Sequence, residues 1–374
     1  MSNTELQSKQ PLHVLHVVSQ FGRGGMEMAL ARVTRALSGM GIRHSIVAIG
    51  TSQDAAELLP PEVPLYCLGA GRRDWRLPLR LWRLICRIGP DVIHARNWGA
   101  LPDVATARLL TARVPLIFSL HGWSNLTHMP LRRRVAFTLV AATATRLFAV
   151  SSELQQVLQE RFSWRAASIP VIPNGVDTGL FRPAGSPRSE GGAVIVGTAG
   201  GLRAIKNHAL LIRSCAALAA RGLDIELRIA GKGELQNDLA ALAQTLGFAA
   251  RLTLAGNLED VPSFLRGLDI FALSSYSEGH PNALLEAMAC ALPSVATAVG
   301  SVREVLEGGR YGRLVPSDDT DAMAAAIASL AGNRELRLRL GQEARQHVCR
   351  NYGMERMAAA YAELYRRTAA GAAT

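Results

Sequence analysis

The chain has 374 residues, of which 49% are hydrophobic and 19% are charged. This composition excludes a mostly disordered chain, and the length exceeds what one compact core usually supports, so we expect a two-domain α/β protein. The formal net charge of +11 favours an anionic partner without choosing between nucleic acid, an acidic lipid surface and an anionic substrate.

The amino terminus and the cysteines indicate a cytoplasmic protein. The stretch Met1–Pro11 holds one cation and lacks the apolar run of a signal peptide. The most apolar stretch, Val135–Thr145, is shorter than the roughly 20 residues that a spanning helix needs. No cysteines form a C-x-x-C pair, so we interpret them as buried small hydrophobic residues in a reducing compartment. The five cysteines are Cys67, Cys86, Cys215, Cys290 and Cys349.

Strands alternate with helical stretches along the first half of the chain. Leu12–Ser19 is an apolar, β-branched run, followed by a glycine-rich turn at Gly22–Gly25 and a helical pattern from Glu27. Because strands that alternate with helices form parallel sheets, we expect a doubly wound sheet. The later predicted strands of this half are Ser45–Ile49, Asp91–His94, Leu116–Leu120 and Leu147–Ser151.

A stretch rich in Pro, Gly and Ser, Pro183–Gly192, interrupts the alternation, which then begins again. We therefore predict a first Rossmann-like domain at residues 1–177, a linker at 178–192, a second Rossmann-like domain at 193–353, and a final helix at 354–374 that packs on either domain. Open parallel sheets bind ligands beyond the carboxyl ends of their strands, so two facing sheets imply a cleft. The second half has predicted strands at Ala193–Ala199, Ile225–Ala230, Leu252–Ala255, Ile270–Leu273 and Ser294–Thr297.

The stretch Ser274–Met288 follows one of these strands and carries the most informative polar residues. A helix is predicted to begin at about Asn282, and its free N–H groups suit a phosphate or a sugar hydroxyl. Asn282 and Glu286 are four residues apart and share a helical face. Glu278 lies in the preceding loop and is placed to meet the same ligand from another side.

Glu278 and Glu286 flank seven residues, and this E-x7-E spacing within EGHPNALLEAM resembles the signature of the retaining glycosyltransferases of family four, which have the GT-B fold. Other segments resemble that family in the same order, so the resemblance spans about residue 12 to residue 365. These segments are Gly24–Glu27, Asp91–His94, His121–Gly122, Ile172–Asp177, Leu202–Asn207, Ala255–Asn257, Val299–Glu304 and Gly312–Val315.

The resemblance implies retaining transfer of a sugar from a UDP- or GDP-sugar to an acceptor bound by the first domain. It assigns Glu278 to a hydroxyl of the donor sugar and Lys206 to the diphosphate, since a carboxylate accepts hydroxyl hydrogen bonds and a cation neutralises the leaving group. It also places His121 near the transferred sugar and Glu286 on the ribose. The remaining implied donor-binding residues are Gly24, Gly25, Asn257, Gly279, His280, Pro281, Asn282 and Leu285.

One position departs from the family. Members of that family usually carry an arginine five residues before the lysine, in a G-R-L pattern, whereas this chain has Gly201 before Leu202. Arg203 is the nearest cation that could replace it, because a guanidinium grips a diphosphate with two hydrogen bonds. The chain has no zinc-ligand spacing, so we expect neither a metal nor a resident cofactor.

Simpler interpretations stay open at this point. The two glutamates and Lys206 could be solvated surface charges, and His121 could be a strand-end histidine without a ligand. A nucleotide-sugar epimerase of the same architecture, or a non-catalytic glycan- or nucleic-acid-binding protein, are alternative functions. Against nucleic acid, aromatic residues make up only 5% of the chain and do not alternate with cations.

The segment Arg72–Arg87 mixes arginines with Trp75 and Trp82. It is either a helix whose apolar stripe packs inward, or a peripheral contact with an anionic membrane that brings the enzyme to a lipid-linked acceptor or another polysaccharide precursor.

Overall fold

The computed structural model describes residues 11–22, 25–71, 74–111, 114–122, 130–161, 169–185 and 191–371. The chain divides into two compact units. The first unit comprises Met1–Pro173 with Glu355–Thr374, and the second comprises Asn174–Met354. The predicted linker, residues 178–192, therefore falls within the second unit. In the described part of the chain, no helix combines the length and the apolar composition needed to span a bilayer.

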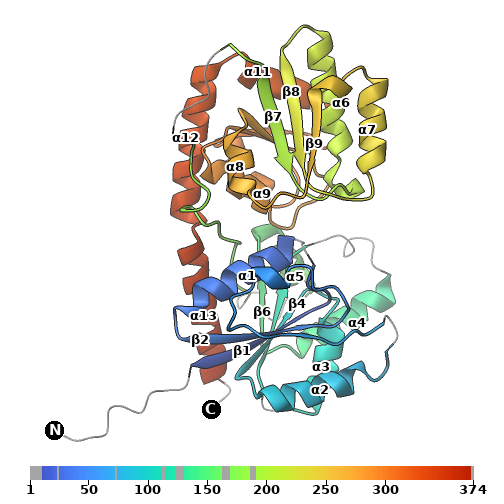
Figure 1. Cartoon of the computed structure of the whole chain (residues 1–374). Helices are drawn as coiled ribbons and strands as arrows, with labels where there is room; N and C mark the ends of the chain where they lie inside the picture. Colours follow the sequence, from blue (N-terminus) through green and yellow to red (C-terminus); the bar gives the residue numbers. More distant parts are fainter. Residues whose placement is uncertain are drawn as a thin grey trace, which may run out of the picture. The chain divides into compact units, whose positions relative to one another are not determined.

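The first unit is built on a six-stranded parallel sheet (Figure 1). Its strand order is β3-β2-β1-β4-β5-β6, so the chain winds outward from β1 and then returns to place β4 on the other side of β1. The strands are β1 (Leu12–Val18), β2 (Ile42–Ala48), β3 (Leu65–Cys67), β4 (Val92–Arg96), β5 (Leu116–Leu120) and β6 (Arg146–Ala149). The helices are α1 (Gly25–Ser38), α2 (Leu77–Ile88), α3 (Leu101–Leu109), α4 (Leu131–Ala142), α5 (Ser152–Arg161) and α13 (Met354–Ala370).

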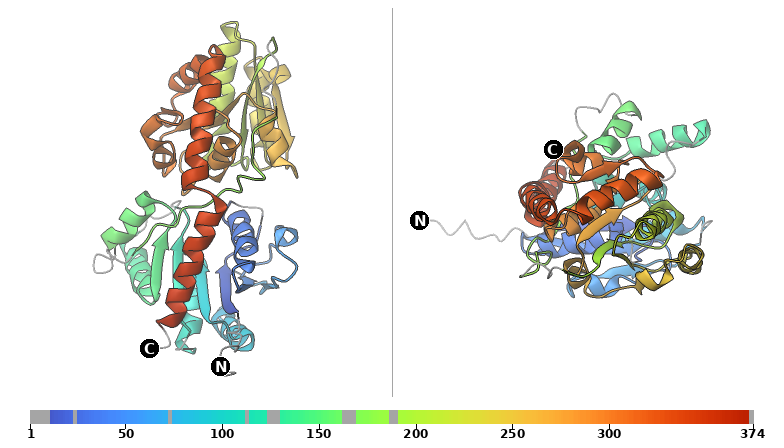
Figure 2. Two further views of the ribbon diagram at one scale, coloured as in Figure 1. Left: turned by 90° about the vertical axis from the view of Figure 1, so that its left-hand side faces the viewer. Right: turned by 90° about the horizontal axis from the view of Figure 1, so that it is seen from above.

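Helix α13 returns from the end of the chain to the first sheet, as the left view of Figure 2 shows. Its residues Met357, Tyr361 and Tyr365 are buried, and the Tyr365 hydroxyl lies 2.9 Å from Nδ1 of His94 in β4. These buried positions are four residues apart, so one face of the helix is buried on the sheet.

The second unit repeats this architecture with strand order β12-β11-β10-β7-β8-β9, all parallel. Its strands are β7 (Val194–Ala199), β8 (Ile225–Ala230), β9 (Leu252–Gly256), β10 (Ile270–Leu273), β11 (Ser294–Thr297) and β12 (Arg313–Val315). Its helices are α6 (His208–Ala220), α7 (Gln236–Thr245), α8 (Val261–Arg266), α9 (Asn282–Ala289), α10 (Val302–Val305), α11 (Thr320–Ala331) and α12 (Arg334–Asn351).

Two apolar clusters cover the two faces of the second sheet. Neighbouring strand residues alternate between them, with Val196 in one cluster and Ile195 in the other. Helices α6, α7 and α11 contribute to the first cluster, and α8, α9 and α10 contribute to the second. Strands buried on both faces read as continuous apolar runs, which is why the sequence predicts them. Both sheets confirm the predicted α/β architecture.

Two strands were not predicted. β3 and β12 have three residues each and lie at the edges of their sheets. A run of three residues is too short to show a hydrophobic period.

The prediction of five buried cysteines is wrong in part, because the structure exposes Cys67, Cys86 and Cys349 and buries the other two. Cys67 ends the edge strand β3, and Cys86 lies on α2 away from its buried residues.

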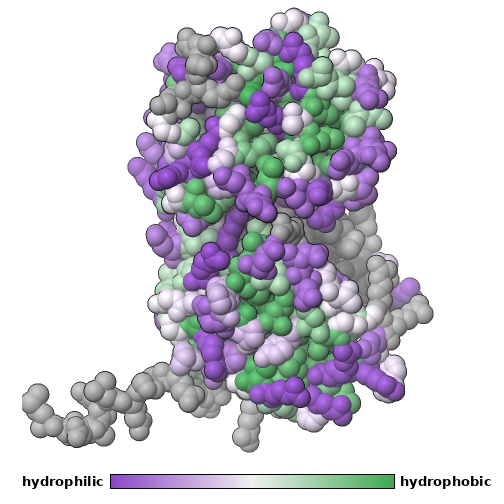
Figure 3. Space-filling view, viewed as in Figure 1, coloured by the Kyte–Doolittle hydropathy of each residue, from purple (hydrophilic) through white to green (hydrophobic). Residues whose placement is uncertain are grey.

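The basic segment that includes α2 packs mostly inward. Leu77, Leu81, Leu84 and Ile85 of α2 are buried, so its apolar stripe belongs to the fold, as the first of the two interpretations predicts. Trp75 is 79% exposed before the helix. Residues 72 and 73 lie outside the described residues. On the face drawn in Figure 3, hydrophilic and hydrophobic residues are interspersed.

Candidate active site

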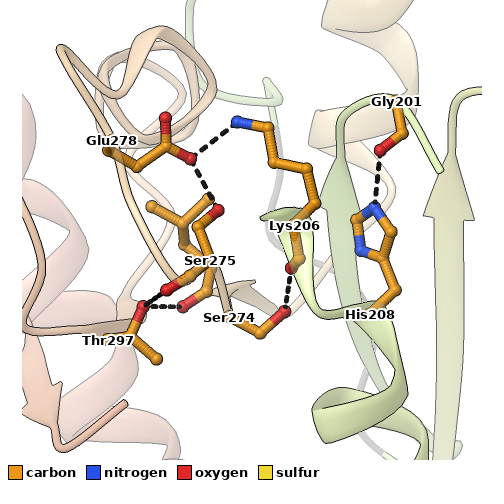
Figure 4. Close-up of polar contacts among 8 residues, drawn as sticks. Gly201, Lys206, His208, Ser274, Ser275, Glu278 and Thr297 are labelled. Atoms are coloured by element: carbon orange, nitrogen blue, oxygen red, sulfur yellow. Dashed lines mark hydrogen bonds and ion pairs between the residues drawn. The ribbon is translucent and has the colours of Figure 1, made fainter. Parts of the chain in front are cut away.

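Lys206 and Glu278 meet where the second sheet reverses its winding. Lys206 follows β7 and Glu278 follows β10, and these two strands are neighbours although β8 and β9 separate them in the sequence. Such a reversal leaves the loops at the carboxyl ends of the two strands to line a crevice. Lys206 Nζ lies 2.6 Å from Glu278 Oε1 (Figure 4), so the structure brings two of the predicted catalytic residues together.

The two loops are held to each other by the backbone as well. Ser274 Oγ donates to the Lys206 carbonyl at 2.9 Å, and the backbone N–H of Tyr276 donates to the Ile205 carbonyl at 2.8 Å. Thr297 Oγ1, at the end of β11, donates to the Ser275 carbonyl at 2.7 Å. The positions of Lys206 and Glu278 are therefore set by three neighbouring strands, since buried polar groups are held by their hydrogen bonds.

The Glu278 carboxylate is buried, with 8% exposure. Its Oε1 accepts from Lys206 Nζ and from Ser275 Oγ, each at 2.6 Å. Among the described residues its Oε2 accepts no hydrogen bond, and it points away from both donors (Figure 4). A carboxylate has about four lone-pair sites and an ammonium has three donors. The pair can therefore take up a hydroxyl and an anion without losing its own contact.

A glycine makes room for the loop that carries Glu278. Gly300 has φ +54°, and a Cβ on it would lie 1.8 Å from the Glu278 carbonyl oxygen. Next to it, Ser301 Oγ donates to the Gly279 carbonyl at 3.0 Å. The loop after β11 thus supports the backbone on both sides of the Glu278–Gly279 peptide.

We expect Gly300→Ala to displace Glu278 and to lower transfer strongly. Gly308 is the matched control, because it also has a positive φ, +67°, but a Cβ on it would have nothing within 4 Å. Both alanine variants should lose about 1–2 kcal/mol from the strained backbone, measured as the free energy of unfolding. Only Gly300→Ala should also lose activity beyond its loss of folded protein; equal activity of the two variants would contradict this account.

Helix α9 begins at Asn282, as the sequence predicts, and carries Glu286 at 8% exposure. Asn282 Oδ1 accepts from Asn174 Nδ2 at 2.9 Å, so Asn174 supports the start of the helix. His280 is buried, which lowers its pKa to about 3 and keeps the imidazole neutral. Its ring centre lies 5.9 Å from that of Tyr352, so the neutral imidazole packs against this aromatic ring.

Two predicted donor-binding side chains lie apart from this cluster. Leu285 is 1% exposed and belongs to an apolar core cluster, so its side chain packs inward. Asn257 is exposed and follows the edge strand β9, which β8 separates from β7. Gly24 lies outside the described residues, and Gly25 is the first residue of α1.

The space beside Gly201 is occupied by Arg203. A Cβ on Gly201 would lie 3.1 Å from Arg203 Nε and 3.5 Å from its Nη2. The Arg203 side chain is exposed, and its guanidinium folds back over Gly201, the position where the family resemblance predicts an arginine. The backbone of Gly201 is not in the left-handed region, so that position is open to other residues.

In the first unit, His121 ends a chain of polar contacts that starts at α13. The Tyr365 hydroxyl lies 2.9 Å from His94 Nδ1, and His94 Nε2 lies 2.8 Å from Ser119 Oγ. Ser119 Oγ lies 2.8 Å from His121 Nε2. The guanidinium of Arg96, 1% exposed, also approaches that nitrogen, with Nη1 3.5 Å away.

Arg96 fixes the donor-to-acceptor direction of the hydrogen bonds in this series of contacts. A guanidinium only donates, so His121 Nε2 accepts and the proton of the neutral ring lies on Nδ1. Ser119 then donates to His121 and accepts from His94 Nε2, whose Nδ1 accepts from Tyr365. Burial, and next the Arg96 charge, hold the pKa of His94 well below its usual range. The ring ¹⁵N shifts of His121 would report this tautomer, and a proton found on Nε2 would refute it.

The structure adds residues to the first-unit site that sequence analysis missed. Asn97 has φ 62°, accepts from the His121 N–H at 2.8 Å through Oδ1, and contacts Met26 Sδ at 3.2 Å through Nδ2. Its only sequence signal is its place after a predicted strand. Arg96, Ser119, Ser275 and Thr297 also sit at strand ends, where a search of each carboxyl-terminal polar residue would find them.

Among the described residues, no cluster of three or more His, Cys, Asp or Glu side chains could hold a metal ion. The charge near Glu278 comes from Lys206 instead.

Comparison with known proteins matches both units to glycosyltransferase families. Residues 23–180 match the family described as Glycosyltransferase Family 4, and residues 193–333 match Glycosyl transferases group 1. This chain is a glycosyltransferase of the group 1 and family 4 type. The two matches follow each other along the chain, as the resemblance of the predicted motifs requires.

Relatives of the glycosyltransferase span nearly its whole length. It is 27% identical to a D-inositol 3-phosphate glycosyltransferase of Arthrobacter sp. (strain FB24), over 91% of this chain and 90% of that protein. It is 26% identical to the putative glycosyltransferase EpsF of Bacillus subtilis (strain 168), over 90% and 94% of the two chains. The crystal structure of Anabaena Alr3699/HepE in complex with UDP-glucose shares the fold, with a TM-score of 0.84, 21% identity, and 95% and 100% coverage.

Proposed function

We propose that this glycosyltransferase transfers a hexose from a UDP- or GDP-sugar to an acceptor with retention at the anomeric carbon. The observation that carries the proposal is the contact of 2.6 Å between Lys206 and Glu278 at the reversal point of the second sheet. The Anabaena structure that shares its fold binds UDP-glucose, and this supports a nucleotide-sugar donor without identifying it here.

Each residue of the cluster has a chemical role in the proposal. Lys206 neutralises the donor diphosphate as the bond to the sugar breaks, and the backbone N–H groups at the start of α9 add to it. Glu278 accepts a sugar hydroxyl through Oε2, and Glu286 accepts from the ribose. The leaving diphosphate helps to accept the acceptor's proton, so no carboxylate of the enzyme attacks the sugar, and no metal or cofactor is required.

We propose that the first unit binds a lipid-linked or polysaccharide-precursor acceptor at the cytoplasmic face of the membrane. Leu131, Val135 and Leu139 of α4 are 74%, 50% and 66% exposed and are four residues apart, so they form an apolar stripe. Trp75 adds a second exposed apolar group. The protein should float with anionic vesicles at low salt, and less of it should float at high salt. Binding that is absent, or that does not decline with salt, would contradict electrostatic attraction to the membrane.

The proposal is tested with a panel of nucleotide sugars and no acceptor, then with acceptor. A donor at 100 times its dissociation constant should add about 2.7 kcal/mol to the free energy of unfolding. With inositol phosphate or glycan acceptors, NMR of the product should show the donor's anomeric configuration. An inverted product would contradict retention, and conversion of the donor to an epimer without acceptor would identify an isomerase instead.

We expect Arg203→Ala to lower donor turnover about thirtyfold, which corresponds to about 2 kcal/mol for one charge-assisted hydrogen bond. Gly201→Arg in that background should restore part of the turnover, because its side chain enters the space that Arg203 leaves. Arg221→Ala, at the far end of α6, is the control for loss of an exposed arginine. Unchanged turnover in Arg203→Ala would show that this loop relies on Lys206 alone.

A further inference from the structure

The second unit has a large cavity at the amino-terminal ends of its strands, whereas Lys206 and Glu278 lie at the carboxyl-terminal ends. It is lined by Val194, Asp269 and Pro293, which lie at the amino ends of β7, β10 and β11, and by one face of α12. Its volume is about 1000 Å³, which is enough for a molecule of nucleotide size. The catalytic cluster lies at the carboxyl ends of the same strands, so the two sites are separated by the length of the strands.

Positive charge dominates the lining of this cavity. Five guanidiniums face one carboxylate, that of Asp269, whose Oδ2 already accepts from the Ile195 N–H at 2.9 Å. The five are Arg266, Arg334, Arg337, Arg345 and Arg350.

The contacts of four of these arginines, Arg266, Arg337, Arg345 and Arg350, do not neutralise them. Arg337 Nη1 donates to the Leu330 and Ala331 carbonyls at 2.8 and 2.7 Å. Arg345 donates to the carbonyls of Phe181 and Ala289. Arg266 donates to Ser263 Oγ at 2.7 Å. Within the described residues, Arg266, Arg337, Arg345 and Arg350 form no ion pair. The cavity therefore concentrates net positive charge on a concave surface, where anions are attracted most strongly.

We propose that this cavity is a second ligand site, which binds a phosphate-bearing molecule with an apolar part. Arginine is the side chain best suited to phosphate, because its planar donors match the phosphate oxygens in pairs. The rest of the lining includes Leu268, Leu292 and Leu338, which would contact the organic part of such a molecule. A free organic phosphate and a phospholipid headgroup share this chemistry, and the test below separates them.

Cys349 reports on the cavity directly, because it lines the cavity and is exposed. Cys67 and Cys86 are exposed in the first unit and serve as internal references. The experiment measures the rate of alkylation of each cysteine by iodoacetamide, a neutral reagent, with mass spectrometry of the full-length protein's peptides. Inorganic pyrophosphate is the free probe, and vesicles with and without phosphatidylglycerol are the lipid probe.

We expect pyrophosphate at ten times its dissociation constant to slow Cys349 alkylation about tenfold, because about a tenth of the sites stay empty, and to leave Cys67 and Cys86 unchanged. Protection should persist in Lys206→Ala, which separates this site from the catalytic cluster and from the proposed function. The double variant Arg266→Ala/Arg350→Ala should need at least about tenfold more probe. Arg339→Ala, on α12 but outside the lining, should behave as the parent.

Protection only by phosphatidylglycerol vesicles, with the same dependence on Arg266 and Arg350, would assign the site to a lipid headgroup. Protection by neither probe, protection that the double variant keeps unchanged, or protection lost in Lys206→Ala would overturn the proposal. If the double variant does not fold, Arg350→Gln serves instead, since this exposed side chain forms no hydrogen bond or ion pair within the described part of the chain.

Discussion

Replacing Lys206 by alanine should lower kcat/KM for sugar transfer about a thousandfold. Loss of one donor to a developing anion costs about 2.7–4 kcal/mol of transition-state stabilisation. The change also removes the ammonium that lies 2.6 Å from Glu278 Oε1, so the buried carboxylate loses its cation. The effect should fall mostly on kcat, since the charge on the leaving diphosphate is greatest in the transition state.

Two variants bracket the effect at Lys206. Lys232→Ala is the matched control, because Lys232 is exposed in the loop after the neighbouring strand β8 and should leave the rate unchanged. Lys206→Arg keeps the charge and should recover part of the rate. If Lys206→Ala retains more than about a tenth of the parent's kcat/KM, the main contribution to leaving-group stabilisation lies elsewhere.

Glu278→Gln should lower the transfer rate about a hundredfold or more, whereas the dissociation constant for the free nucleotide should change only about threefold. The amide keeps the size of the side chain but removes the charge that Lys206 and Ser275 contact. Hydrogen bonds to a charged group contribute about 1.5–3 kcal/mol, and the sugar hydroxyl and the position of Lys206 both depend on this one.

Glu286→Ala is the contrasting variant for Glu278. If Glu286 accepts a hydrogen bond from the ribose, its loss should weaken the binding of both the free nucleotide and the nucleotide sugar, measured by calorimetry. A Glu278→Gln enzyme with full transfer activity would reject the sugar-binding role. Equal nucleotide affinity in Glu286→Ala and the parent would reject the ribose assignment.

Sequence analysis predicted Lys206 and Glu278 as two separate site residues, but it did not predict that they form an ion pair. Lys206 and Glu278 are 72 positions apart, and their contact follows from the order of β7 and β10, which lie side by side although two other strands separate them along the chain. Periodicity shows that a residue follows a strand, but it does not show which strands are neighbours. The support by Thr297 and Gly300 has the same origin, since both follow β11, the next strand of the sheet.

The first unit shows the same limit more sharply. Sequence analysis selected His121 but neither Arg96 nor Tyr365, because a buried arginine and a helix about 240 residues further on leave no local pattern. The structure places Arg96 at 1% exposure, with its Cζ 5.5 Å from the centre of the Tyr361 ring of α13. The cavity lined by α12 is likewise formed by segments that are distant in sequence.

The sequence by itself determined the α/β class, the alternation of strands and helices in both halves, and the family. These depend on apolar runs, on glycine and proline positions and on the ordered motifs from Gly24 to Val315, all of which are local. Only the tertiary structure decided that Glu278 shares an oxygen between Lys206 and Ser275, that Arg203 folds over Gly201, and that Leu285 packs into the core. Those facts depend on which chain segments meet in space, and parallel sheets bring distant segments together at their strand ends.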